Sequence, residues 1–506
     1  MSIKIAYVPL DGRPCNAKFP KKIAEIAGIE IITPPSELLG YFKKPGDCEK
    51  LAAWLEGVSK KVDRAVVSVE MIIYGGLIAS RGPGTKLDEA MKRIEVFRII
   101  KRVNPKIEVS AFSIIMRLST TAGVEVGEEL WKKIFRYSEL FDLVEEFGLF
   151  DDKVELSRLE KEIPQDILYG FLGARARNHE VNKKMLQLIS EGNLDFLVVG
   201  EDDVAIHGLH RKEREALKRI AAELLIGGKV KMICGADEVG MMLVAKNVLG
   251  KHNPKIFVAA TDEGGLDLVP LYEDRPLLAS IVEHIDLIGA IKTNRENDAD
   301  LLLFVNAPQG KQRDLFLDGP SKLGRDFKDF VGKIKGAIGS GKAVAIADVA
   351  YANGADPEFM EALLKDVSVE KLASFSAWNT ASNSIGSALA QAVIGLSDTE
   401  HRTQSTPALP AGREHRKRMF LLERFIDDYL YQTILRQRIK NDLQEAGTSI
   451  YDLKDEYASV NWVVKEELKK SASDLAKKHF KDVKTADIEI DLPWPRIFEI
   501  NINLKS

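Results

Sequence analysis

Three consecutive acids, Glu201, Asp202 and Asp203, are the residues in this chain best suited to chemistry. They follow the apolar, β-branched run at 196–199, which is typical of a buried strand. Because a strand interior would not tolerate three acids, we expect them where the strand ends, at the edge where α/β proteins bind ligands. Adjacent carboxylates repel, so one can keep its proton while its neighbour is ionised. The pattern therefore predicts acid/base chemistry; the alternative is a helix-capping or surface ion-pair role.

Other strand-like segments also end in acids, amides and arginines. Since the carboxyl ends of parallel strands share one edge, we expect these side chains to line a single polar pocket. Any one of them, such as Asp348 or Asn379, is equally well explained as a helix cap, and only their number favours a pocket. The side chains predicted to bind substrate there are Asp11, Arg13, Asn16, Glu70, Arg177, Asp237, Glu238, Asp274, Arg275, Asn306, Asp348, Asn353, Trp378, Asn379 and Asn383.

A pocket with this lining suits a carbohydrate. Sugar hydroxyls need paired donors and acceptors, and sugar faces stack on aromatic rings such as Trp378. Two acids that differ in pKa suit glycosidic cleavage, in which one of them protonates the leaving oxygen. We therefore expect a glycosidase-type hydrolase in which Asp202 orients an N-acetyl group and Asp203 is the general acid/base.

Two alternatives use the same residues differently. In the first, a hard cation such as Mg²⁺ or Mn²⁺ serves hydrolysis, and His207 is a possible further ligand. Apart from this alternative, no cofactor is expected. The acids available for that cation are Asp11, Glu70, Asp202, Asp203, Asp237, Glu238 and Asp348. A zinc site is less favoured, because the eight histidines include no HExxH pair, although His207 and His210 lie three apart. In the second alternative the chain is a non-catalytic sugar- or metabolite-binding protein.

Strand-like segments alternate with amphipathic helices along most of the chain. This alternation predicts an α/β fold of repeated βα units with parallel sheets. Ten strands are too many for one eight-stranded barrel, so we expect two doubly wound lobes plus a helical C-terminal region; a (β/α)8 barrel with extra elements is the alternative. The predicted strands are 4–9, 29–33, 64–70, 106–115, 196–199, 229–235, 255–260, 299–306, 342–347 and 372–377.

Turn-forming residues at two places in the chain predict boundaries between three domains. Gly, Asn and Pro at 250–254 mark a boundary, and the helical stretch at about 118–191 is an insertion of the kind that covers active sites. Residues 403–413, with two prolines and a glycine, indicate a linker. We expect a first α/β lobe at 1–250, a second at 251–402, and a helical region with an extended tail at 403–506.

The composition excludes several classes of partner. The chain has 506 residues, 45% of them apolar and 29% charged, with a net charge of −4 that offers no footprint for nucleic acid or an anionic membrane. No apolar run is long enough to span a bilayer and no secretory signal begins the chain, so we expect a cytoplasmic protein. Three widely spaced cysteines predict no disulfide framework. The expected partner is a small-molecule or carbohydrate substrate, with a homo-oligomer left open.

Several motifs resemble those of a large prokaryotic family filed as a domain of unknown function. The resemblance covers essentially the whole chain and implies that the C-terminal helices belong to the same protein unit; the family brings no known activity with it. The doubled Asp202-Asp203 is also similar to the acid pair of hyaluronidase-like N-acetylhexosaminidases. The family motifs are YVPLDGRPCN at 7–16, DDV at 202–204, GADE at 235–238, YEDRP at 272–276, WNTASN at 378–383 and LPWPR at 492–496.

Overall fold

The computed structural model describes residues 3–121, 126–322, 324–396, 411–481, 483 and 487–505. The chain forms two compact units, each built from several segments. The first unit comprises 1–12, 30–240 and 272–274, and the second comprises 13–29, 241–271 and 275–506. The C-terminal helices thus lie in the same unit as the second sheet. The three-domain division stays a prediction, and most of its linker, 403–410, lies outside the described residues.

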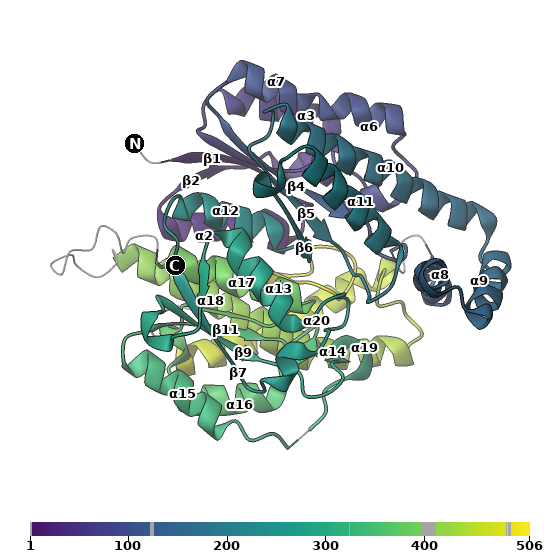
Figure 1. Cartoon of the computed structure of the whole chain (residues 1–506). Coiled ribbons are helices and arrows are strands. Elements are labelled where there is room, and N and C mark those ends of the chain that lie inside the picture. Colours follow the sequence, from purple (N-terminus) through teal and green to yellow (C-terminus); the bar gives the residue numbers. More distant parts are fainter. Residues whose placement is uncertain are drawn as a thin grey trace. The chain divides into compact units, whose positions relative to one another are not determined.

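The first unit is built on a parallel six-stranded sheet with the order β2-β1-β3-β4-β5-β6 (Figure 1). Residues 65–67 in its third strand are fully buried, as expected for a parallel sheet with both faces covered. Its strands are β1 (Lys4–Val8), β2 (Glu30–Ile32), β3 (Arg64–Ser68), β4 (Glu108–Ile115), β5 (Phe196–Glu201) and β6 (Val230–Cys234).

The second unit holds a parallel five-stranded sheet with the order β13-β11-β9-β7-β8. Counted along the chain, both sheets place their first strand between the second and the third, which is the order of a doubly wound fold. The α/β prediction with two such lobes is confirmed, and the described strands form no closed barrel. The strands are β7 (Lys255–Ala260), β8 (Ile291–Thr293), β9 (Leu301–Asn306), β11 (Ala343–Asp348) and β13 (Ser374–Ser376).

Helices cover the first sheet, and the predicted insertion is helical. Within it, α8 and α9 contact each other, α10 lies against β4 and β5, and α11 contacts both α8 and α10 (Figure 1). The helices of this unit are α3 (Cys48–Ser59), α4 (Val69–Tyr74), α5 (Leu77–Arg81), α6 (Leu87–Ile94), α7 (Val96–Val103), α8 (Glu128–Phe147), α9 (Phe150–Glu162), α10 (Gln165–Ser190) and α11 (Leu209–Glu223).

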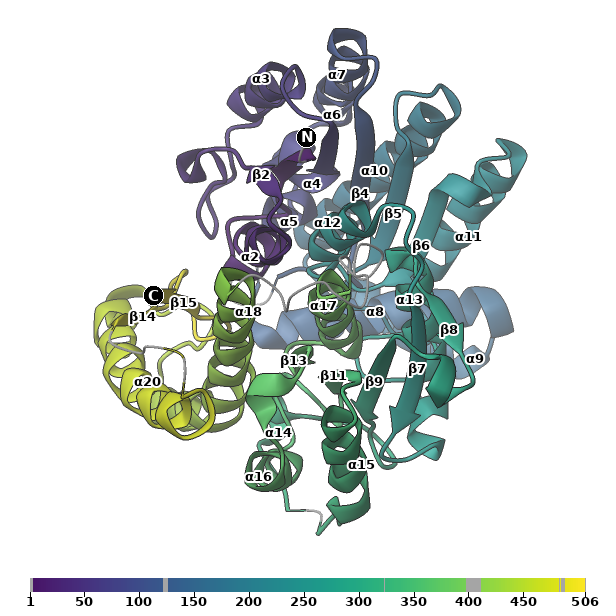
Figure 2. The same ribbon diagram turned by 90° about the vertical axis from the view of Figure 1, so that its left-hand side faces the viewer.

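In the second unit, α17 lies against β11 and β13, and the C-terminal helices enlarge the same apolar core. The rings of Phe375 and Phe425 stack there with their centroids 4.4 Å apart. Figure 2 shows α20 beside the hairpin β14 (Asp487–Asp491) and β15 (Asn501–Lys505). The helices are α1 (Pro14–Ala17), α2 (Phe19–Ala27), α12 (Val239–Leu249), α13 (Leu277–Ile288), α14 (Leu315–Asp318), α15 (Lys328–Gly339), α16 (Pro357–Asp366), α17 (Ala381–Ile394), α18 (Ala411–Arg424), a π-helical stretch (Phe425–Leu435), α19 (Arg436–Glu445) and α20 (Tyr457–His479).

None of the helices in the described ranges combines the length and the apolar character needed to cross a membrane.

Two elements differ from the sequence prediction. The third strand ends at Ser68 and not at 70, because the Ser68 side chain accepts a hydrogen bond from the Met71 amide (3.2 Å) and begins α4. The valines on both sides of Ser68 continue the strand-like pattern, so periodicity does not indicate that a helix starts there. Strand β8 was not predicted, because its three residues lie at the sheet edge and are mostly exposed, so no apolar run marks it.

The turn after α4 offers a test of the fold. Gly75 has φ 84°, and a Cβ there would lie 2.6 Å from the Gly46 amide nitrogen. We expect Gly75→Ala to lower the free energy of unfolding by about 2 kcal/mol or more, because strain and a backbone clash add. In the matched control Gly57→Ala, inside α3, a Cβ meets nothing within 4 Å, and we expect a gain of about 0.5–1 kcal/mol. Urea unfolding followed by circular dichroism measures both; equal effects would contradict the packing described.

Candidate functional site

The carboxyl edge of the first sheet carries the densest group of predicted site residues. The strand order reverses between β1 and β3, and ligands bind at such a switch point in open α/β sheets. Asp11 follows β1, and Glu70 lies in the first turn of α4 directly after β3; both are buried. The Gly76 backbone packs beside Asp11: a Cβ built on Gly76 would lie in van der Waals contact with the Cβ of Asp11, at 3.6 Å. The switch point therefore holds two buried acids and a close backbone.

Glu70 completes the hydrogen bonding of β4. Strand β3 ends at Ser68, opposite Phe112, so β3 offers no backbone acceptor to the next amide of β4 on that side. Instead Glu70 Oε1 accepts the Ile114 N–H at 2.8 Å, and Ser113 Oγ lies 3.4 Å away. Glu70 Oε2 is buried and makes no hydrogen bond to any residue that the structure describes. One carboxyl oxygen thus accepts the hydrogen bond that a backbone carbonyl of β3 would otherwise accept. The other oxygen is available to a ligand.

This position makes Glu70 a neutral acid near pH 7. Its pKa is raised from 4.5 to about 8, mainly by burial and to a smaller extent by the Asp202 charge, while the Ile114 and Ser113 hydrogen bonds oppose the shift only in part. A carboxyl group held protonated in this way can donate a proton to a substrate atom. The sequence analysis placed Glu70 at a strand end and named it as a substrate-binding residue or a cation ligand, not as an acid. The signal that it carried was a single acid inside an apolar run.

Asp202 and Asp203 lie at the end of β5, as predicted, but each faces an arginine. Arg81 Nη2 lies 2.6 Å from Asp202 Oδ2, and Arg117 Nε lies 3.3 Å from the same oxygen. A second nitrogen of Arg117 pairs with Asp203, whose backbone is left-handed (φ 37°). These guanidinium groups favour the charged form of both acids. A proton held on one acid by repulsion from the other stays a prediction, and neither arginine was in the predicted site.

Glu70 and Asp202 are hydrogen-bonded to two consecutive residues of β4. Glu70 Oε1 is bonded to the amide of Ile114, and the Asp202 amide donates to the carbonyl of Ile115 (3.2 Å). One acid is desolvated, and the other is paired with arginines. Environments that give two neighbouring acids different pKa values are typical of acid/base sites.

The side chain of Glu238, in the turn after β6, is held by the backbone of that turn. Its Oε2 accepts a hydrogen bond from the Ala236 amide at 3.1 Å. Gly235 has φ 102°, a left-handed backbone that favours glycine, and a Cβ there would displace the Glu238 carboxyl group. Asp237 lies buried in the same turn. This geometry explains the Gly-Ala-Asp-Glu motif as a tight turn that fixes two acids at the carboxyl edge.

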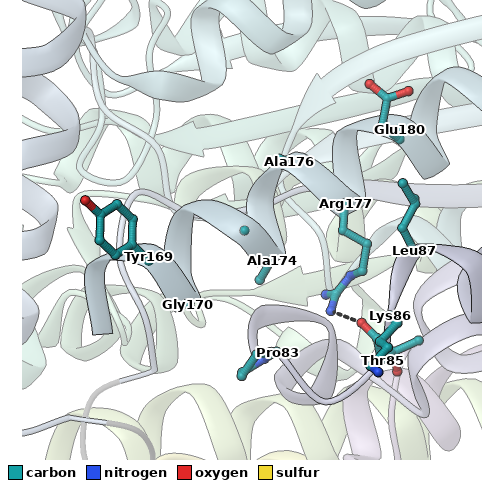
Figure 3. A pocket seen from close by; sticks show the side chains of 11 residues that line it. Pro83, Thr85, Lys86, Leu87, Tyr169, Gly170, Ala174, Ala176, Arg177 and Glu180 are labelled. Carbon is teal, nitrogen blue, oxygen red and sulfur yellow. Dashed lines mark hydrogen bonds between the residues drawn. The ribbon is translucent and has the colours of Figure 1, made fainter. Parts of the chain in front are cut away.

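Arg177 lies on α10, beside an open groove of about 410 Å³ (Figure 3). Its guanidinium donates to the carbonyls of Gly82 (2.9 Å), Thr85 (2.8 Å) and Ser80. It also lies over the Tyr74 ring, 4.5 Å from the centroid. These contacts fasten the loop at 80–85 to α10. A substrate-binding role for Arg177 stays a prediction.

In the second unit the carboxyl edge holds a satisfied network around Asp348. One of its oxygens accepts from Asn306 Nδ2 (2.8 Å) and the other from the Asp356 amide (2.7 Å). Burial and the charge of Asp356 raise the pKa of Asp348 to about 8. Arg325 Nη1 pairs with Asp356 at 3.0 Å. Arg325 was absent from the sequence prediction, which had no way to place it here.

Several predicted binding residues of the second unit hold loops together. Asn353 and Asn379 have left-handed backbones, and the Asn353 amide donates to the Asn379 carbonyl at 2.8 Å. Trp378 is 4% exposed and its Nε1 lies 3.4 Å from Ser387 Oγ, so its ring is part of the interior. Asn383 donates to Thr380 Oγ1 at 3.0 Å.

Three further predicted residues also lie in this unit. Arg275 forms a two-contact ion pair with Glu283 (2.9 and 2.7 Å). Arg13 lies over the Trp494 ring, 5.6 Å from its centroid, and Asn16 is buried in α1.

The predicted residues are therefore divided between the units. Their assembly into one pocket stays a prediction. The first unit holds Asp11, Glu70, Arg177, Asp202, Asp203, Asp237, Glu238 and Asp274; the second holds Arg13, Asn16, Arg275, Asn306, Asp348, Asn353, Trp378, Asn379 and Asn383.

His207 and His210 belong to different side-chain groups. His207 lies with Asp142 and Glu146, and His210 lies with Glu201 and Asp274. In each group one ligand atom per residue falls within 4.8 Å of the others. The two histidines, three apart in the sequence, thus lie in separate groups, because α11 begins between them. Binding of Mg²⁺ or Mn²⁺ by the acids named from the sequence stays a prediction.

The comparisons with known proteins identify the family. The model of the family described as "Protein of unknown function (DUF4127)" matches residues 5–503, so the chain belongs to that family. No curated protein matches the chain. Among solved structures, the chain is weakly similar to the crystal structure of Anabaena Alr3699/HepE in complex with UDP and glucose, at 10% sequence identity. The alignment covers 88% of this chain and 100% of the HepE chain. Its TM-score of 0.13 carries no argument about fold or function.

The pKa of Glu70 predicts a pH-dependent stability. An acid whose folded pKa is raised from 4.5 to about 8 stabilises the fold fully below pH 4.5 and loses that contribution as the pH rises through 8. Glu70→Gln removes this loss. We therefore expect the stability of wild type relative to Glu70→Gln to fall between pH 5 and 9, by up to about 5 kcal/mol. Urea unfolding across this range measures it, with Glu180→Gln, at an exposed acid on α10, as control. A constant difference would contradict the assignment.

Proposed function

We propose that this protein is a hydrolase of glycosidase type whose acid/base pair is Glu70 and Asp202 of the first unit. The observation that carries the proposal is the carboxyl group of Glu70, which burial holds protonated and whose Oε2 has no hydrogen-bond partner among the described residues. A protonated acid beside an arginine-paired carboxylate is the combination that cleavage of a glycosidic bond requires.

Each residue then has a defined task. Glu70 gives its proton to the leaving oxygen as the bond to the sugar carbon breaks. The Asp202 carboxylate, fixed by Arg81 and Arg117, stabilises the positive charge that develops on the sugar or orients an N-acetyl group. A water molecule then adds to the sugar carbon and returns a proton to the Glu70 carboxylate. The reaction ends with Glu70 in its starting state.

This assignment moves the general acid from Asp203 to Glu70. Asp203 is ion-paired with Arg117 and is strained at φ 37°, a combination that suits positioning of the β5 turn. The sugar-like substrate is inferred from the acids and amides at the carboxyl edge.

We expect Glu70→Gln and Asp202→Asn each to lower kcat/KM on the best substrate from a panel of aryl glycosides by about 100-fold or more. Glu423→Gln is the matched control: Glu423 is also a buried acid, but its partner is Lys22 in the second unit, and its loss should leave kcat/KM unchanged. Retained activity in Glu70→Gln together with loss in Asp203→Asn would restore the sequence-based assignment.

The pH profile of the same reaction gives a second test. Because Glu70 acts in its protonated form, we expect kcat/KM to fall as the pH rises through about 8. A parallel series with a chelator addresses the Mg²⁺ or Mn²⁺ alternative. Activity that disappears with chelator and returns with Mg²⁺ would favour that alternative, and binding without turnover over the panel would favour a non-catalytic protein.

A further inference from the structure

A second polar cluster in the first unit has a different chemical character. It joins Glu201 at the end of β5, Cys234 at the end of β6, and Asp274 from the segment 272–274 to two residues of α11, His210 and Arg214. Glu201, Cys234 and His210 are fully buried. The cluster unites carboxylate, imidazole and thiol groups, and the acid/base pair of the proposed function uses none of them.

The distances between these side chains are those of a metal-ligand set. Asp274 lies 3.3 Å from His210 Nε2 and, through its other oxygen, 3.3 Å from Cys234 Sγ; Glu201 Oε2 lies 3.7 Å from the same sulfur. Bonds of about 2.0–2.3 Å in a tetrahedral site separate neighbouring ligand atoms by roughly 3.3–3.8 Å. Glu201, His210 and Asp274 each offer one ligand atom within 4.8 Å of the others, and the Cys234 sulfur lies beside the two carboxylates.

The thiol lies where a further ligand would be needed. Cys234 Sγ faces one carboxylate oxygen of Glu201 and one of Asp274. As a thiol it donates hydrogen bonds to these oxygens, and as a thiolate it can bind a cation placed between them. His210 presents Nε2 to the same Asp274 carboxyl group.

A cationic group already occupies the centre of the cluster. Arg214 Nη1 lies 3.1 Å from both oxygens of Glu201 and also pairs with Asp274. With two carboxylates and one guanidinium, these side chains carry one more negative than positive charge. A divalent ion in place of the guanidinium, with Cys234 deprotonated and its proton lost to solvent, would leave the cluster with the same net charge and release Arg214.

We propose that Glu201, His210, Cys234 and Asp274 form a binding site for a divalent transition metal of the zinc class, and that Arg214 occupies the cation position when the metal is absent. The thiolate selects against Mg²⁺ and Mn²⁺, which prefer oxygen ligands. Because Glu201 directly precedes Asp202, the ion would fix the end of β5 beside the acid/base pair. The site stands or falls independently of the proposed hydrolysis.

The test uses Co²⁺ as a spectroscopic probe on the full-length protein. We expect one equivalent of Co²⁺ to give the visible bands of a tetrahedral site together with a sulfur-to-cobalt charge-transfer band. Cys234→Ser should abolish the charge-transfer band and weaken binding by about 100-fold or more. His207→Gln, in the thiol-free group with Asp142 and Glu146, is the matched control and should change neither. Absence of the band in wild type, its survival in Cys234→Ser, or its loss in His207→Gln would each overturn the proposal.

Arg214 provides a test that does not depend on spectra. Removing the guanidinium in Arg214→Gln leaves two buried carboxylates without it, so we expect the melting temperature to fall and Zn²⁺ to restore it. We also expect Zn²⁺ to bind this variant at least about tenfold more tightly than wild type, because its competitor is gone. Arg211→Gln is the matched control, since Arg211 spans Asp142 and Glu146 in the other group. Destabilisation of Arg214→Gln that Zn²⁺ does not reverse would show a purely structural ion pair and contradict the proposal.

Discussion

The hydrogen bond from the Ile114 amide to Glu70 is the constraint on which the candidate site depends. Strand β3 stops at Ser68 because that serine begins a helix, so β4 loses a backbone acceptor. A buried amide without a partner costs about 1–3 kcal/mol, and the Glu70 carboxyl meets that need at 2.8 Å. The carboxyl group is buried at this place, and burial raises its pKa more than the hydrogen bond lowers it. The neutral acid is therefore a consequence of how the sheet ends.

The two sheets show why chemistry is assigned to one of them. Both have a buried acid at the carboxyl edge whose pKa is raised to about 8, Glu70 in the first and Asp348 in the second. Asp348 uses both oxygens, in hydrogen bonds to the Asn306 side chain and the Asp356 amide. Glu70 uses only one. A carboxyl with both oxygens committed stabilises its loop, whereas one with an uncommitted oxygen can serve a ligand.

Local pattern determined much of the fold but little of the site. Apolar runs between turn residues gave the strands of both sheets, except the exposed edge strand β8, and Asp202 was expected at a strand end. The order of the strands and the partners of the acids depend on contacts distant in sequence. Arg81 reaches Asp202 across 121 residues, and Asp274 joins Glu201 only after folding. Trp378, expected to stack on a sugar, is buried, and its ring nitrogen lies beside Ser387 Oγ. No spacing rule distinguishes these outcomes in advance.

The most direct measurement is an infrared pH titration of protein carrying ¹³C-labelled glutamate carboxyls, compared with the Glu70→Gln variant. The account predicts a protonated carboxyl band at pH 7 that is missing from the variant and disappears from wild type as the pH rises through about 8. Identical spectra for the two proteins at pH 7 would show that Glu70 is ionised, and would contradict the central claim.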